Sequence, residues 1–282
     1  MTGKIRLLAR FLNYYVQVVP KRLFLLLPPS ESKRVGGHSQ CRHDEFAQEL
    51  KQPRTTLKKS LLLHISAAES PLARTFKSSG QLLQRSIEAN RESCNGSGLV
   101  LPTWRRYSGV VWVHLDPESL STAQRHRLLV PSALHGLTTG RDEIGEYRLA
   151  MSASIDGVGR LATYWREPLT QLLTTHCRGG IVVNLLTSEF DPAIDSTRLA
   201  ECSRVVNVRF VSADEQKAVG HDAKAVKGFL ARSILLYGLK AIDDFAWMGW
   251  RARKEQDQVT VVAPAVRQMV LATRSKKSSP EN

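Results

Sequence analysis

A serine, a glutamate and a lysine follow a short apolar run near the amino terminus. Ser30, Glu31 and Lys33 come after residues 23–27, which are all Leu or Phe, and after two prolines. A lysine three residues after a serine could activate that serine as a nucleophile. The S-D-N and K-T-G segments that accompany this spacing in penicillin-binding enzymes are absent from the sequence. The spacing alone therefore does not identify a nucleophile.

Three residues of the types that bind metals lie close together a little further on. His38, Cys41 and His43 could hold zinc or iron if a fourth ligand joined them. A polar loop that happens to contain these residues is the simpler interpretation, so we expect no metal and no cofactor. The dinucleotide-binding, P-loop, H-E-x-x-H and G-x-S-x-G motifs are also absent. No common enzyme class is identified by motif.

Residues 223–237 have the periodicity of an amphipathic helix. Apolar side chains collect on one face, and Lys224, Lys227 and Arg232 fall on roughly the opposite one. A basic face of this kind can bind phosphates, although a merely solvated face has the same pattern. Residues 134–137, Leu-His-Gly-Leu, could form a hairpin between helices whose backbone N–H groups also reach phosphate.

The net charge favours a polyanionic partner. The chain has 40 Lys and Arg against 26 Asp and Glu, a formal charge of +14. A field of this sign attracts nucleic acid or an anionic membrane surface. Most of the excess lies towards the two ends, because residues 101–200 are balanced in charge. The charge therefore supports nucleic-acid binding only in part.

The elements that must position these residues are a mixture of strands and helices. Continuous apolar runs predict strands at 23–27, 110–113, 181–186, 205–211 and 259–262. Helical patterns cover 70–91, 116–129 and 223–237, whereas residues 33–60 resemble an exposed loop that leads into a helix. The predicted class is α/β (mixed α+β), with one elaborate domain rather than a simple doubly wound sheet.

The ends of the chain are predicted to be extensions, with the domain between them. Residues 1–22 are an N-terminal extension, 23–255 the domain, and 256–282 a C-terminal extension with a disordered basic tail. Charged residues interrupt the apolar stretch at 7–27, so it predicts no membrane span, and it lacks a signal cleavage site. The four cysteines are widely spaced and are expected to be free thiols of a cytoplasmic protein.

Six segments, taken in order, resemble the YaaA family. They cover about residues 23–248. The segments are 25–33 (LLLPPSESK), 107–111 (YSGVV), 132–151 with Tyr147-Arg148-Leu149, 164–165 (YW), 182–190 with Asn184, Ser188 and Glu189, and 223–232 (AKAVKGFLAR). In two places the chain departs from the family. Residues 138–140 read Thr-Thr-Gly where the family has Leu-Arg-Pro, and Gly145 and Glu146 replace later prolines.

The resemblance implies a role in the peroxide-stress response. It implies a single α/β domain with a central sheet, a positively charged cleft and a helix-hairpin-helix-like element that binds double-stranded DNA, and a function in limiting iron-dependent oxidative damage. Under this hypothesis Lys224, Lys227 and Arg232 contact phosphates, and Lys33, Arg148 and residues 134–137 help to form the cleft. Binding of this kind is largely independent of sequence.

Two other functions are consistent with the same residues. An enzyme that acts on a nucleotide-like or phosphorylated small molecule would use a polar cleft, with Glu31 and Glu189 as acid and base. Its other polar residues would be Ser30, Tyr147, Asn184 and Ser188. A structural partner protein is the third hypothesis, and only the terminal extensions favour it. No residue is assigned a catalytic role from the sequence.

Overall fold

The centre of the protein is a mixed sheet built from the apolar runs. The computed structural model describes residues 22–66, 69–214 and 221–264. Its eight-stranded sheet has the order β10-β11-β12-β9-β8-β1-β3-β4. The strands are β1 (Leu23–Leu26), β3 (Leu128–Ser132), β4 (Gly136–Thr139), β8 (Ile181–Asn184), β9 (Arg204–Val211), β10 (Ala246–Trp247), β11 (Trp250–Glu255) and β12 (Gln258–Val262).

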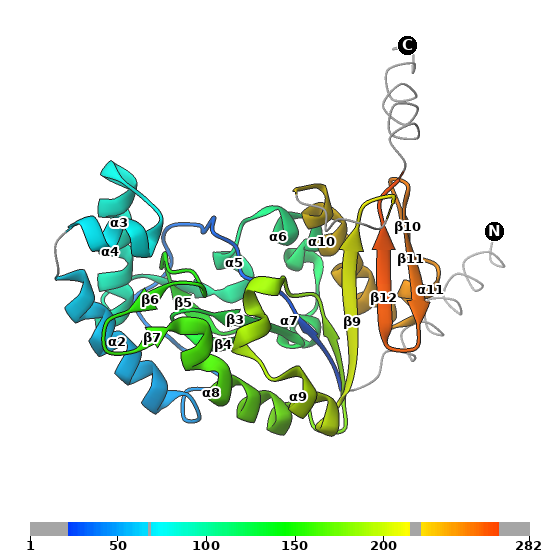
Figure 1. Cartoon of the computed structure of the whole chain (residues 1–282), viewed down its shortest axis with the longest axis horizontal. Coiled ribbons are helices and arrows are strands. Elements are labelled where there is room, and N and C mark those ends of the chain that lie inside the picture. The colour runs from blue at the N-terminus through cyan, green and yellow to red at the C-terminus, as the bar shows by residue number, and fades with distance from the viewer. Residues whose placement is uncertain (1–21, 67–68, 215–220, 265–282) are drawn as a thin grey trace, which may run out of the picture.

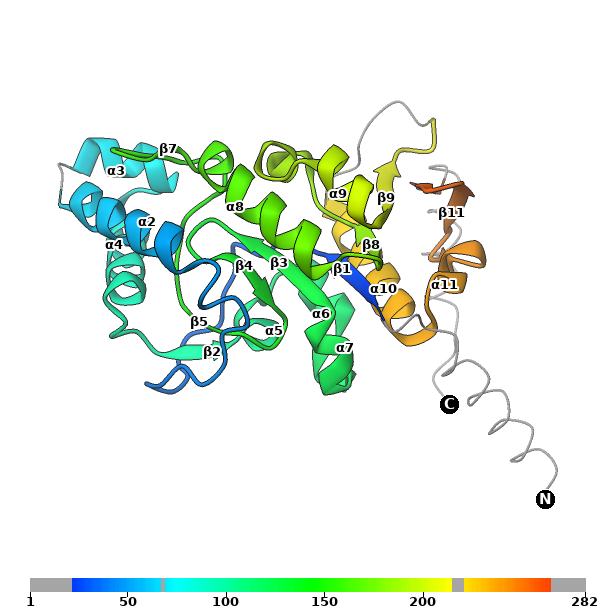
Figure 2. The ribbon, with the colours of Figure 1, turned by 90° about the horizontal axis from the view of Figure 1, so that it is seen from below.

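The five strands from β12 to β3 run parallel to one another. Strands β1 and β3 are buried at every residue, because helices cover both faces of the sheet. Figure 2 shows α8 (Leu161–His176) and α9 (Ser196–Cys202) on one side of these strands. Helices α6 (Val110–Leu115) and α10 (His221–Tyr237) lie on the other side.

Strand order makes the carboxyl end of β1 a special position. Strand β1 lies between β3 and β8, so the chain moves from β1 to one neighbour and later returns to the other. Open α/β sheets bind ligands at such switch points, beyond the carboxyl ends of the strands. Here that position is occupied by the loop that carries Ser30 and Lys33.

Smaller elements surround the sheet. At the β4 end lie α2, α3 and α4, and at the opposite end lie β10, β11 and α11 (Figure 1). These and the remaining elements are α2 (Lys51–Ile65), α3 (Glu69–Phe76), α4 (Gly80–Asn95), α5 (Thr103–Arg106), η1 (Pro117–Ser119), α7 (Thr122–His126), η2 (Ser188–Ala193), α11 (Lys240–Asp243), and the short strands β2 (Val100–Pro102), β5 (Glu143–Gly145), β6 (Ser154–Ile155) and β7 (Gly159–Arg160).

The predicted fold class, a mixed α/β domain around a central mixed sheet, is confirmed, as are four of the five predicted strands. The fifth, residues 110–113, is wrong, because this segment forms the start of helix α6. Its buried residues are Val111, Trp112 and Leu115, a helical spacing, whereas Val113 is 64% exposed. The β-branched composition of the run favoured a strand, but packing against α10 decides its conformation.

Two predicted helices are also divided. Residues 116–129 form η1, α7 and the start of β3, because Asp116 has the left-handed φ of 46° and Ser121 begins a new helix with a capping box. Residues 70–91 form α3 and α4, with Lys77 at a φ of 49° between them. The helix predicted at 223–237 is confirmed as α10. The N-terminal extension up to residue 21 and the basic tail lie outside the described residues.

Candidate functional site

Ser30 fastens the loop after β1 to the turn between α5 and α6. Its hydroxyl oxygen accepts hydrogen bonds from the N–H groups of Ser108, at 3.2 Å, and Gly109, at 3.1 Å. Its proton is donated to the carbonyl of Ser32 at 2.5 Å. A Cβ on Gly109 would lie 2.7 Å from that of Ser30, so the approach requires glycine. Ser30 is therefore a structural residue rather than a nucleophile poised for attack.

Lys33 lies against two tyrosine rings. Its Nζ is 4.3 Å from the ring centre of Tyr147 and 5.5 Å from that of Tyr107. It donates a hydrogen bond of 2.9 Å to the carbonyl of Ser30 and a longer one of 3.5 Å to that of Glu31. Among the described residues, no carboxylate lies within ion-pair distance of this ammonium group.

The surroundings of Lys33 favour its neutral amine. Burial, with the positive charge of Arg148 next, lowers its pKa from 10.5 to about 7, while Glu146 and Glu31 act in the opposite direction. At neutral pH the uncharged amine of Lys33 is therefore far more populated than that of an exposed lysine. A neutral lysine amine is a nucleophile and a base, which the protonated form is not.

A chain of hydroxyl groups lies beside Lys33. The N–H of His135 donates to Ser132 Oγ at 3.0 Å, and Ser132 donates to the Tyr147 hydroxyl at 2.9 Å. That hydroxyl lies 2.7 Å from the Tyr107 hydroxyl. Either hydroxyl can donate in the Tyr107–Tyr147 hydrogen bond, and Tyr147 is the link that joins Tyr107 to Ser132. Burial raises the pKa of both tyrosines, so both stay protonated.

His135 completes this group, which we call the Lys33 cluster: Lys33, Tyr107, Ser132, His135 and Tyr147. The His135 ring meets that of Tyr147 edge-on, with centroids 5.3 Å apart. Burial, with the charge of Arg54 next, lowers the pKa of His135 well below its usual value, so the ring is neutral. Within the described part of the chain, its Nε2 has no hydrogen-bond partner.

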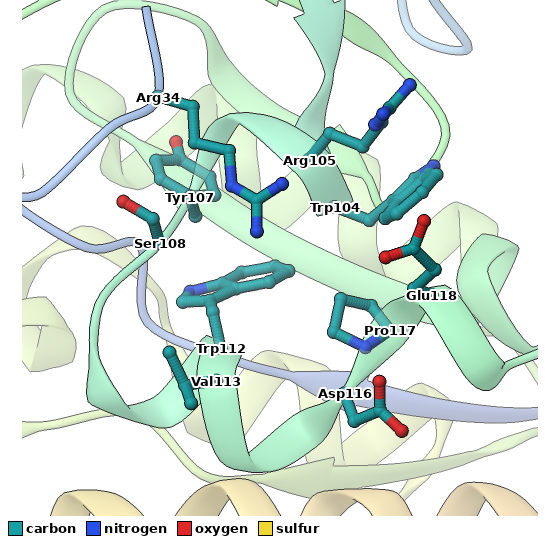
Figure 3. A pocket seen from close by; sticks show the side chains of 10 residues that line it. All are labelled: Arg34, Trp104, Arg105, Tyr107, Ser108, Trp112, Val113, Asp116, Pro117 and Glu118. Atoms are coloured by element: carbon teal, nitrogen blue, oxygen red, sulfur yellow. The ribbon is translucent and has the colours of Figure 1, made fainter.

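A cavity of about 170 Å³ adjoins the cluster. Figure 3 shows the ring of Tyr107 in one wall, and the guanidinium group of Arg34 above the ring of Trp112. Two further lining residues, Trp104 and Arg105, come from α5. In the described residues, no carboxylate pairs with Arg34 or Arg105. We call Arg34, Trp104, Arg105 and Trp112 the arginine–tryptophan face.

Asp116 and Glu118 line the opposite side of the same cavity. Figure 3 shows their carboxylates near Pro117, across from Arg34. Asp116 Oδ2 lies 3.1 Å from Arg232, so its charge is already paired. The cavity therefore has cationic and anionic sides with aromatic rings between them. Such a lining suits a flat, polar ligand with both donor and acceptor groups.

A second cavity of about 270 Å³ lies at the carboxyl end of β8. Asn184 donates to the side chain of Asn207 at 3.2 Å and accepts from the N–H of Leu186 at 3.1 Å. Asp191 also lines this cavity, and burial raises its pKa. The amide of Asn184 is thus used by the protein itself, and most of the remaining lining is apolar.

The predicted basic face of α10 does not form as expected. Lys227 is only 7% exposed, and its Nζ donates to the carbonyl of Leu185 at 2.6 Å. Burial lowers its pKa to about 8. Arg232 binds the Asp116 carboxylate and the hydroxyl of Ser119. Lys224 alone of the three is exposed. The periodicity was right, but both sides of this helix are packed.

The predicted polar residues are only partly brought together. Lys33 and Tyr147 meet, and the main chain of Arg148 is held by the Asn90 side chain. The Arg148 side chain lies 3.9 Å from Glu146. Exposed Glu189 accepts a bond from the N–H of Ser152 at 3.4 Å.

Two predicted site residues stay apart from the Lys33 cluster, and a third, Glu31, contacts it only through its main-chain carbonyl. Glu31 and Ser188 are exposed, and Asn184 belongs to the second cavity. No hydrogen bond or ion pair between described residues joins Asn184, Ser188 or Glu189 to that cluster.

The hairpin expected at residues 134–137 belongs to the sheet. This segment is the turn from β3 to β4, and Leu134 and Leu137 are completely buried. It does not join two helices, so the helix-hairpin-helix interpretation of this segment is wrong. The residues that resemble metal ligands also have separate partners: His38 pairs with Glu143 at 3.0 Å, and His43 with Asp142 at 2.9 Å.

Tyr107 and Ser132 were part of recognised motifs but received no role from the sequence, and nor did His135. Their hydroxyl and ring contacts join residues 12 to 40 positions apart in the chain, which periodicity does not reveal. Arg34, Trp104, Arg105 and Trp112 carried no motif signal beyond their types. A pair of tryptophans near two arginines, Arg105 and Arg106, was the available indication of a binding surface.

Comparison with known proteins explains why these segments occur together. The sequence model of the family described as "Peroxide stress protein YaaA" matches residues 23–256, which include the Lys33 cluster and the arginine–tryptophan face. The chain belongs to the YaaA family.

Relatives of this chain include a UPF0246 protein of Streptomyces coelicolor, which is 29% identical over 224 residues. This match covers 77% of the chain and 84% of the relative. A UPF0246 protein of Francisella tularensis subsp. novicida is 32% identical over 142 residues, about half of each protein (49% and 56%). None of the helices in the described part of the chain is long and apolar enough to span a membrane.

Proposed function

We propose that this cytoplasmic protein binds double-stranded DNA in the peroxide-stress response, largely without sequence preference, and so helps to limit iron-dependent oxidative damage. The YaaA family membership supports the stress role. The observation that carries DNA binding is the arginine–tryptophan face, where two arginines without a carboxylate partner in the described residues flank an aromatic cavity.

The composition of this face suits a nucleic acid. Guanidinium groups bind the phosphates of a duplex in a bidentate manner, whereas Trp112 is only 2% exposed and has little surface on which a base could stack. Helices α5 and α6 are joined by only three residues, Tyr107, Ser108 and Gly109. This is a compact helix–turn–helix arrangement, and Ser30 holds its turn. We therefore place the proposed helix-hairpin-helix-like element at the turn between α5 and α6 rather than at residues 134–137.

The terminal segments add to the attraction for DNA in a separate way. Segments outside the described residues hold nine of the 40 basic and two of the 26 acidic side chains. Much of the positive charge can therefore act without belonging to the arginine–tryptophan face. The two contributions are distinguished by variants that change the same number of charges at different places.

Fluorescence anisotropy with a labelled duplex at several salt concentrations tests the proposal. The Arg34→Ala/Arg105→Ala protein should bind more weakly and have a log–log salt slope smaller by about 2, since each phosphate contact contributes roughly 0.9. The matched control is Arg166→Ala/Arg198→Ala, which removes two arginines that pair with Asp195 and Glu167. Equal losses in the two proteins would assign binding to net charge alone. No duplex affinity at low salt would refute DNA binding.

A second function is favoured by the Lys33 cluster. We propose as the alternative an enzyme acting on a nucleotide-like or phosphorylated small molecule, because a lysine with a pKa of about 7 at the switch point of the sheet is typical of catalytic sites. Thermal-shift measurements with nucleotides and sugar phosphates distinguish the two. Stabilisation that survives Arg34→Ala/Arg105→Ala but is lost in Lys33→Met supports the enzyme. Stabilisation by duplex DNA alone argues against it.

A further inference from the structure

Lys33 has an environment that DNA binding does not require. Phosphate contacts are made by exposed, protonated side chains. Lys33 instead lies against two tyrosine rings and is held by the carbonyls of Ser30 and Glu31, with no carboxylate of the described residues within ion-pair distance. A neutral amine has two N–H donors and one lone pair. The two carbonyls can occupy the donors, and the lone pair is left for a ligand.

We propose that Lys33 forms a Schiff base with the aldehyde of a sugar that carries a phosphate ester. Two sources have this chemistry: the open sugar of an abasic site in DNA, and a free sugar phosphate. The first rests on the DNA-binding function proposed above, and the second does not.

The condensation uses groups already in the cluster. The Lys33 nitrogen attacks the aldehyde carbon, and one of its protons passes to the carbonyl oxygen to give a carbinolamine. The C–O bond then breaks as the Tyr107 hydroxyl protonates the departing oxygen, which leaves as water. The second nitrogen proton restores the tyrosine, so the amine and the aldehyde give an imine and one water. The Tyr107 hydroxyl is linked through Tyr147 to Ser132, so protons can be exchanged along this chain of hydroxyl groups.

Arg148 supplies an independent indication that the ligand is an anion. Its Nε is buried and has no hydrogen-bond partner among the described residues. Its nearest carboxylate, Glu146, lies at 3.9 Å and is shared with Arg85. The positive charge of Arg148 also lowers the pKa of Lys33. A phosphate bound to Arg148 would place the aldehyde of the same sugar near the amine.

Borohydride trapping tests the proposal on the full-length protein. The protein is incubated at pH 7 with a duplex carrying one abasic site, an intact duplex, or deoxyribose 5-phosphate, and sodium borohydride reduces any imine to a stable amine. We expect an adduct on the peptide that contains Lys33, located by mass spectrometry. Lys33→Arg should reduce the yield at least tenfold, Tyr107→Phe should slow its formation, and the control Lys59→Arg, at an exposed lysine of α2, should change neither.

The outcomes separate the two proposals. An adduct with abasic DNA alone assigns the DNA source, and one with the sugar phosphate alone assigns the free source. Normal duplex binding without a Lys33 adduct to either probe overturns the Schiff base and leaves the DNA-binding function intact. A sugar-phosphate adduct in a protein that binds no duplex supports the Schiff base and overturns the DNA-binding function.

A second measurement on the unaltered protein covers the case in which Lys33→Arg does not fold. The trapping yield at Lys33 should rise with a midpoint near pH 7, because only the neutral amine reacts. Equal labelling of Lys33 and exposed Lys224 across this pH range would overturn the inference.

Discussion

Replacing Lys33 by methionine should stabilise the protein by an amount that depends on pH. The unfolded amine has a pKa of 10.5 and the folded one about 7, so between these values the unfolded chain binds more protons. Stability therefore rises with pH across this window and is lowest below pH 7. Linkage gives a destabilisation of about 4 kcal/mol at pH 7 and about 2 kcal/mol at pH 9. Methionine fills a similar volume and does not titrate.

Urea denaturation of both proteins at pH 7 and pH 9 measures the effect. The stability gained by Lys33→Met should be about 2 kcal/mol greater at pH 7 than at pH 9. Other titrating groups, including Lys227, cancel because both proteins share them. The control Lys224→Met should change the free energy of unfolding equally at both pH values, since an exposed ammonium is hydrated in both states. A gain from Lys33→Met that is the same at both pH values would refute the desolvated amine.

Three substitutions test the packing that positions the cluster. Gly228→Ala places a Cβ 2.2 Å from the carbonyl oxygen of Val111 and should cost about 1–3 kcal/mol in a thermal melt, because α10 must move away from α6. Arg106→Met leaves four main-chain carbonyls without their buried donor and should reduce the free energy of urea unfolding by about 3 kcal/mol. Ser30→Ala should cost about 1–2 kcal/mol but preserve borohydride trapping at Lys33; loss of trapping in a folded protein would contradict the structural role of this serine.

The strands were predictable because their composition reports their burial. A run such as residues 23–27 is apolar at every position, which only a strand covered on both faces, or a buried helix, requires. The same composition misled at residues 110–113. There the choice between strand and helix depends on α10, which lies more than 100 residues later in the chain. Local pattern contains no information about that contact.

The candidate site was predictable only in part, for a related reason. Lys33 and Tyr147 stand out by motif, but their meeting with Tyr107 depends on the strand order of the sheet. Helical periodicity correctly separated Lys227 from the apolar face of α10. It could not show that Gly228, beside it, allows α6 to approach so closely that this side of the helix is covered as well.

Lys33 and Lys227 are both desolvated by burial, but their contacts differ. Lys227 donates at 2.6 Å to the carbonyl of Leu185, which lies just past the end of β8 and would otherwise lack this donor. The burial of Lys227 is therefore accompanied by a hydrogen bond that holds the end of β8. Lys33 contacts only loop carbonyls and ring faces, and a second cation, Arg148, makes its charge still less favourable. For stability alone, an apolar side chain would serve better at position 33. A group whose presence destabilises the fold, located where parallel sheets bind ligands, is best explained by chemistry.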